Sequence, residues 1–163
     1  NTLFYKLIGE NIFSFFYKKA LVLFVECFIF IFLGITIISL VFSNFSHYLL
    51  LLILFSLVIL QYILIVGTIS LISPNVLVSI GISIIYWIGS IILVAINKNV
   101  FGVIAPFEAS NSMYMSIEKI LNNKMNMINS HDVWTIILFF FIIFIVNFII
   151  LISSKNRWLK LGM

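Results

Sequence analysis

The chain has 163 residues, of which 64% are hydrophobic and only 9% carry a charge. Soluble domains typically carry about 25% charged residues, so this composition excludes an ordinary soluble globular protein. The net charge of +4 does not indicate nucleic-acid binding, because six of the nine basic residues flank the ends of two apolar stretches. These six are Lys6, Lys18, Lys19, Lys155, Arg157 and Lys160.

Four long apolar stretches fill most of the chain, at residues 20–42, 49–72, 76–96 and 133–152. Each has the roughly 20 apolar residues that an α-helix needs to cross a bilayer. None shows the polar face that a helix at the surface of a soluble protein would have. The sequence therefore predicts an all-α integral membrane protein with four transmembrane helices in one domain over residues 1–163.

Residues 1–19 differ from the spans because their apolar side chains recur at helical spacing beside a polar stripe. This pattern predicts an amphipathic helix that lies in the membrane interface. It can serve as a lipid anchor or as a helix offered to a cytoplasmic partner. The chain begins at Asn1 and not at Met, and residues 1–19 lack the apolar core and cleavage site of a signal peptide, so we expect a fragment that lacks upstream spans.

Polar residues within the spans are the exceptions in these stretches. Glu26 carries the one charge inside a span, and we expect it to face the protein interior, to be protonated, or to pair with a nearby base. Gln61 and Asn147 lie in the middle of spans and are expected to hydrogen-bond between helices. Tyr86 and Trp87 lie in the middle of the third span, where we expect them to face another helix.

The connections between spans differ in length and character. The sequence Ser73-Pro74-Asn75 predicts a tight turn, so the second and third spans should be antiparallel neighbours. Residues 97–132 form a much longer segment, with a short apolar stretch at 100–107 and helical character at 112–121. Apolar pieces too short to span a bilayer favour re-entrant or interfacial half-helices.

The distribution of basic residues predicts the orientation of the chain in the membrane. Lysine and arginine near the ends of spans favour the cytoplasmic side. Four spans place both termini on one side, and the basic residues concentrate there. We therefore expect both termini in the cytoplasm and the 97–132 segment outside, in a multi-pass protein of the cell membrane.

No pattern in the sequence indicates a catalytic, cofactor-binding or metal-binding site. Cys27 is the only cysteine, so an intrachain disulfide cannot form, and no cysteine or histidine spacing suits a metal ion. The chain lacks the glycine-rich loop that cradles phosphates in ATPases. Any energy source for work across the membrane is therefore expected on another chain.

The order of these parts resembles the C-terminal portion of a type 2 ABC transporter permease, the export-type membrane subunit. The stretch FYKLIGENIFSFFYKKALVLF is similar to the family's cytoplasmic segment between its second and third spans. SLISPNVLVSIG resembles the inner hairpin, and SSKNRWLKLGM the basic tail. FGVIAPFEASNSM resembles the outer half-helix segment, here with Pro106, Phe107 and Glu108.

The resemblance implies a transport subunit and not an enzyme. It implies that a separate cytoplasmic ABC ATPase pushes on residues near Tyr5, Lys6, Gly9 and Glu10, and that the permease forms a homodimer or a heterodimer. The composition is similar to permeases of low-GC Gram-positive bacteria, which implies export of antimicrobial peptides or other amphiphiles. Two alternatives stay open: a non-transporting protein such as a bacteriocin-immunity or assembly subunit, and a secondary transporter or intramembrane enzyme acting through Glu26.

Overall fold

The structure, a computed structural model, describes residues 11–73, 75–102, 104–105, 112–122 and 130–160. These residues form helices α2 (Ile12–Val41), α3 (Tyr48–Ile72), α4 (Val76–Ile96), α5 (Lys98–Phe101), α6 (Ser112–Leu121) and α7 (Ser130–Lys160). Four of them, α2, α3, α4 and α7, are long and apolar enough to cross a membrane. The predicted all-α membrane fold with four spans is confirmed.

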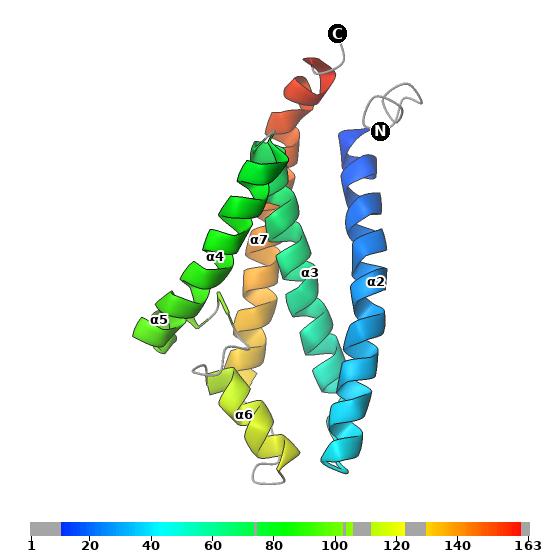
Figure 1. Cartoon of the computed structure of the whole chain (residues 1–163), viewed down its shortest axis with the longest axis vertical. Coiled ribbons are helices and arrows are strands. Elements are labelled where there is room, and N and C mark those ends of the chain that lie inside the picture. Colours follow the sequence, from blue (N-terminus) through cyan, green and yellow to red (C-terminus); the bar gives the residue numbers. More distant parts are fainter. Residues whose placement is uncertain (1–10, 74, 103, 106–111, 123–129, 161–163) are drawn as a thin grey trace.

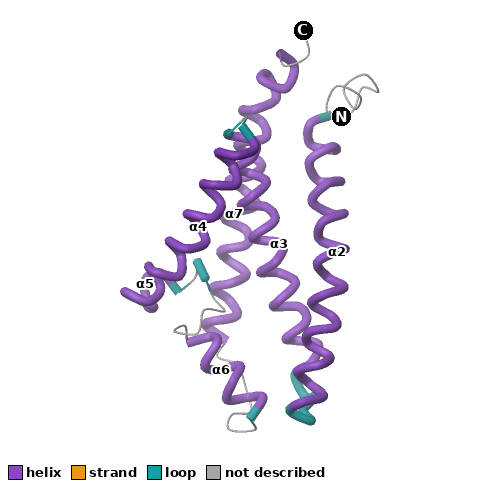
Figure 2. Tube along the Cα trace, in the orientation of Figure 1, coloured by secondary structure: helices purple, strands orange, loops and turns teal. Residues whose placement is uncertain are grey.

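The four long helices run along one axis of an elongated molecule (Figure 1). The start of α2, the turn between α3 and α4, and the end of α7 lie together at one end, which we call the hairpin end. The connection between α2 and α3 and the helix α6 lie at the other end, which we call the loop end (Figure 2). Four antiparallel spans produce this arrangement, as the sequence predicts.

Helix α3 is the central element, and it packs against α2 and α7. The main apolar core is formed by Leu51, Leu54 and Val58 of α3, with Ile35 of α2 and Ile136 of α7. Ile117 of α6 completes this cluster. All of these residues belong to the halves of their helices nearest the loop end, whereas Leu64, Asn147 and Leu151 are buried toward the hairpin end.

The remaining apolar side chains point outward. Phe30 and Leu49, for example, are 76% and 72% exposed, and long rows of exposed Ile, Leu, Val and Phe cover the outer faces of α2, α4 and α7. In water such a surface would drive aggregation. In lipid it costs nothing, because the acyl chains are as apolar as leucine.

Two of the helices are longer than the spans predicted from hydropathy. Helix α2 begins at Ile12 and runs without a break into the span, although residues 12–19 were expected in a separate interfacial helix. Helix α7 continues to Lys160, beyond the predicted end at residue 152. In both places the sequence carries no proline or glycine that would stop the helix, so the helix continues beyond the predicted span.

The two connections at opposite ends are closed by polar side chains. At the hairpin end, the side chain of Asn75 accepts a hydrogen bond of 2.9 Å from the N–H of Leu77 and so caps α4. At the loop end, Ser43 adopts a positive φ of 49° directly after α2. Asn44 Nδ2 then donates a 3.1 Å hydrogen bond to the carbonyl of Ile120, which fastens α6 to the connection.

The long segment 97–132 contains the predicted helix at Ser112–Leu121 and a short helix at Lys98–Phe101. Ala105 is buried, at 6% exposure. The expected outer half-helix residues Pro106, Phe107 and Glu108 lie outside the described residues.

Candidate functional site

The predicted contact with an ATPase precedes α2. Tyr5, Lys6, Gly9 and Glu10 lie outside the described residues, which start at Asn11. Helix α2 follows immediately and crosses the molecule as one continuous rod of 30 residues. A displacement applied to the segment before Ile12 would therefore pass directly into a transmembrane helix.

A chain of polar side chains joins the beginning of that helix to two other spans. The hydroxyl of Tyr17 on α2 donates a hydrogen bond of 3.2 Å to Asn147 Oδ1 on α7. Asn147 Nδ2 donates a bond of 2.7 Å to Thr68 Oγ1 on α3, and Thr68 in turn donates to the carbonyl of Leu64. Asn147 is fully buried, so one side chain links three helices away from lipid.

Aromatic contacts surround this polar link. The ring of Phe13 lies 5.5 Å from that of Phe148, and the ring of Tyr17 lies 5.9 Å from that of Phe144. Aromatic pairs at such distances add about 0.5–1.5 kcal/mol beyond the area that they bury. They hold the hairpin end of α2 against α7.

Gln61 makes a second polar contact between helices. Its Nε2 donates a 2.8 Å hydrogen bond to the carbonyl of Ile136 on α7, and the side chain is only 2% exposed. Gln61 and Asn147 therefore both bridge α3 and α7, at different depths. The sequence analysis singled out both Gln61 and Asn147, but it did not predict the partners of Asn147, which are Tyr17 and Thr68.

Glu26 lies elsewhere. Its side chain is on the exposed face of α2 and does not point into the part of the chain that the structure describes. It takes no part in the hydrogen bonds from Tyr17, Gln61 and Asn147 that join α2, α3 and α7. Any partner of this carboxyl group therefore belongs to lipid, to another chain, or to residues outside those described.

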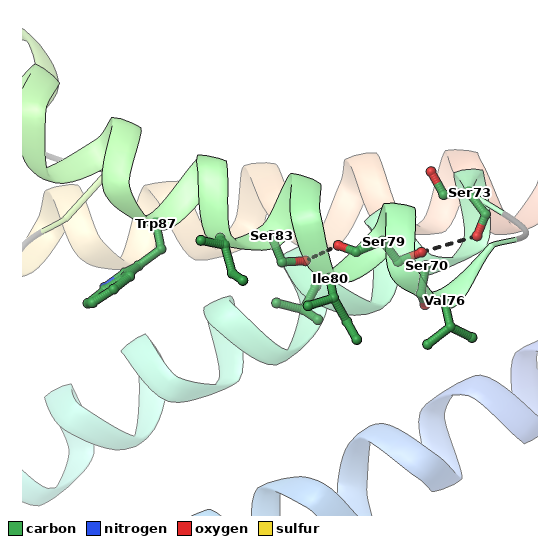
Figure 3. Close-up of a pocket in the computed structure, with 9 residues that line it drawn as sticks. Ser70, Ser73, Val76, Ser79, Ile80, Ser83 and Trp87 are labelled. Atoms are coloured by element: carbon green, nitrogen blue, oxygen red, sulfur yellow. Dashed lines mark hydrogen bonds between the residues drawn. The ribbon is translucent and has the colours of Figure 1, made fainter.

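A pocket of about 510 Å³ lies along the hairpin between α3 and α4 (Figure 3). Four serines line it: Ser70 and Ser73 at the end of α3, and Ser79 and Ser83 on α4. Val66, Val76, Ile80, Ile84 and Trp87 make up its apolar part. Trp87, expected to face another helix, is instead 56% exposed at this pocket.

A second pocket of about 500 Å³ lies between α2 and α3 near the same end. Its lining is almost wholly apolar and includes Phe16, Leu23 and Ile63, with Lys19 and Cys27 also present. Phe16 packs tightly over Gly67, because a Cβ at that glycine would lie 2.7 Å from the ring. Both pockets thus open in the half of the molecule opposite the main core.

Metal-binding chemistry finds no support in the geometry. Within the described ranges, no three His, Cys, Asp or Glu residues approach one another closely enough to hold a metal ion. Cys27 is a free, half-buried cysteine. The side chains that link α2, α3 and α7 through hydrogen bonds of 2.7–3.2 Å are amides and hydroxyls.

Four apolar helices, three of them joined by buried polar links, define a multi-pass α-helical membrane protein. Residues 1–163 match the model of a family described as "Peptide export permease protein YydJ family". The chain belongs to this family and is a membrane permease for export. The resemblance to the export-type ABC permeases that the sequence carries is thereby confirmed.

One relative illustrates the match. The "Probable peptide export permease protein YydJ" of Bacillus subtilis (strain 168) is 60% identical over 163 residues, which are 100% of this chain and 68% of the relative. No solved structure matches the chain significantly.

Proposed function

We propose that the chain is the membrane subunit of an ATP-driven exporter of peptides, with amphiphilic antimicrobial peptides as the cargo class. The name of the relative supports a peptide cargo. ATP hydrolysis is assigned to a separate cytoplasmic ABC ATPase, since the sequence has no phosphate-binding loop. The permease would act as a homodimer or heterodimer, with both of its termini in the cytoplasm.

One observation carries this proposal: the link from Tyr17 through Asn147 to Thr68. The predicted ATPase contact precedes α2, and Tyr17 lies less than two helical turns after Ile12, the first residue of that helix. A push on residues 5–10 would move α2, and the polar link would pass this movement to α3 and α7. An exporter needs such a coupling between a cytoplasmic motor and several spans at once.

The test is coexpression of the permease with the ATPase encoded beside it, followed by purification and measurement of export. We expect the two proteins to copurify and export to require ATP. Replacing Lys6 and Glu10 together by alanine should reduce export, whereas Ser46→Ala, at the loop end, should leave it unchanged. Failure to copurify, or export that continues without the ATPase, would contradict the proposal.

A further inference from the structure

We infer that the serine-lined pocket between α3 and α4 binds a stretch of extended polypeptide, with its main-chain N–H groups directed to the serine hydroxyls. This inference rests on the proposed export of peptides and assigns a binding site to it. The four serines, with Trp87 and Ile80, form this site, which we call the serine pocket.

Three of the four hydroxyl groups of the serine pocket, those of Ser70, Ser79 and Ser83, direct their protons to backbone carbonyls of the chain and leave acceptors for an occupant. Ser83 Oγ donates its proton to the carbonyl of Ser79 over 2.8 Å, and Ser70 Oγ donates to the carbonyl of Gly67 over 2.7 Å. Ser79 Oγ lies 3.2 Å from the carbonyl of Ser73 (Figure 3) and 3.2 Å from that of Asn75. A hydroxyl has one proton but two lone pairs, so each oxygen can still accept a hydrogen bond.

These free acceptors favour an occupant that brings hydrogen-bond donors. A lipid acyl chain brings none, although it could fill the apolar part of the pocket. A polypeptide brings one N–H per residue together with apolar side chains. The serine pocket offers acceptors beside Ile80 and the exposed ring of Trp87, which suits such a mixed ligand.

The spacing of the acceptors fits an extended chain. Ser79 and Ser83 are four residues apart on α4, which places them about 6 Å apart along the helix axis. In an extended polypeptide, every second residue points the same way, and these repeat at about 6.6 Å. Two N–H groups on one edge of the peptide can thus reach both hydroxyls in turn.

The pocket between α2 and α3 provides the contrast. It has nearly the same volume, but its lining is almost entirely apolar. It offers no comparable row of acceptors among the described residues and suits an acyl chain. The two pockets therefore differ in the chemistry of the occupant that each would take.

The test uses the chain in lipid nanodiscs with Trp134→Phe and Trp158→Phe, so that Trp87 is the only tryptophan. The probe is an acetylated, amidated hexapeptide of alternating leucine and glycine that ends in two lysines. Its counterpart, methylated on the main-chain nitrogens, keeps the side chains but loses the donors. We expect the first peptide to change Trp87 fluorescence saturably, and the methylated peptide to bind at least about tenfold more weakly.

Variants of the serines complete the test. Ser79→Ala and Ser83→Ala should each weaken binding of the unmethylated peptide about threefold to tenfold, the usual effect of one lost hydrogen bond. Ser90→Ala is the matched control on the same helix, because Ser90 Oγ donates to the Trp87 carbonyl and does not line the pocket. Circular dichroism would verify that each variant is folded.

Equal binding of both peptides would overturn the inference, since it would show a purely apolar or lipid-filled pocket. Absence of saturable binding would overturn it too. Neither result depends on ATP or on the partner ATPase, so failure here is distinguishable from failure of the proposed exporter. An exporter that works with an unchanged rate in the Ser79→Ala, Ser83→Ala double variant would place the cargo path elsewhere.

Discussion

Asn147 is the residue on which the contact between three helices depends. It accepts a hydrogen bond from Tyr17 and donates one to Thr68, and it is fully buried. Leucine has the same branching and the same number of side-chain heavy atoms but makes neither bond. Hydrogen bonds between membrane helices contribute about 0.6 kcal/mol each on average and up to about 1.7. We expect Asn147→Leu to lower the free energy of unfolding by about 1–2 kcal/mol, measured by unfolding in mixed micelles.

Gln61 provides a graded comparison for that prediction. Gln61→Leu removes one hydrogen bond, to a helix carbonyl, and should cost less than Asn147→Leu. Ser153→Ala, on the exposed side of α7, is the control and should have almost no effect. A loss for Asn147→Leu no greater than for Ser153→Ala would show that the polar link contributes nothing to stability.

For Glu26 we expect replacement by leucine to be favourable, in contrast to the loss of stability expected for Asn147→Leu. It lies seven residues after Lys19, about 10 Å along the axis, on the exposed face of α2. An acidic residue at such a depth opposes insertion by up to about 3 kcal/mol, whereas leucine favours it. Glu26→Leu should therefore raise the fraction of α2 that inserts, measured with a translocation reporter, while Phe30→Leu should leave it unchanged. Lower stability of the folded Glu26→Leu chain would show that this carboxyl group has a partner.

The residue scale also shows what the sequence can and cannot predict. An amide in an apolar span needs a hydrogen-bond partner, so Gln61 and Asn147 were recognisable without a structure. Thr68 was not, because a threonine in a helix can always donate to its own backbone, as it does here. For Glu26 the sequence left several alternatives open, because burial depends on which helix face meets a neighbour. In a span that is apolar all round, hydropathy does not show which face of the helix meets a neighbouring helix.

At the scale of elements, α2 and α3 approach closely where Gly67 of α3, which has no Cβ, faces the ring of Phe16 on α2. A Cβ at Gly67 would lie 2.7 and 2.9 Å from two ring atoms of Phe16. Gly67→Ala would force this ring to move away from α3. Overpacking of this kind costs about 1–3 kcal/mol. We expect the variant to be destabilised by that amount in thermal or denaturant unfolding in detergent.

Two further variants separate this effect from a general effect of glycine replacement. Gly81→Ala on α4 adds the same methyl group where nothing lies within 4 Å, so it should be neutral or stabilising. Combining Gly67→Ala with Phe16→Leu should recover part of the lost stability, because the smaller side chain can yield. If Gly81→Ala is as harmful as Gly67→Ala, the contact with Phe16 is not the cause.

The elements themselves were largely predictable, and their ends were not. Hydropathy located all four spans because each stretch of about 20 apolar residues has one stable conformation in lipid. It could not show that α2 starts at Ile12 or that α7 reaches Lys160, because a helix can continue into water. The two pockets depend on how neighbouring helices diverge, which no residue pattern in one span encodes.

At the scale of the whole molecule, the orientation in the membrane is a prediction from charge. With Cys27 replaced by serine, single cysteines at Lys18 and Ser46 report on the two ends, since both positions are exposed. Ser46→Cys should react with a membrane-impermeant maleimide in intact cells. Lys18→Cys should react only after permeabilisation. The reverse pattern of labelling would place the termini outside and contradict the assigned topology.

The two ends of α2 are fastened by different kinds of contact. Near the loop end it belongs to the main apolar core with α3, α6 and α7. At the hairpin end it is held by the hydrogen bond from Tyr17 to Asn147 and by ring contacts with α7. Apolar packing tolerates small sliding movements, whereas a hydrogen bond weakens as soon as its geometry is distorted. A displacement of α2 at the hairpin end therefore acts first on a directional bond, and one at the loop end acts on packing alone.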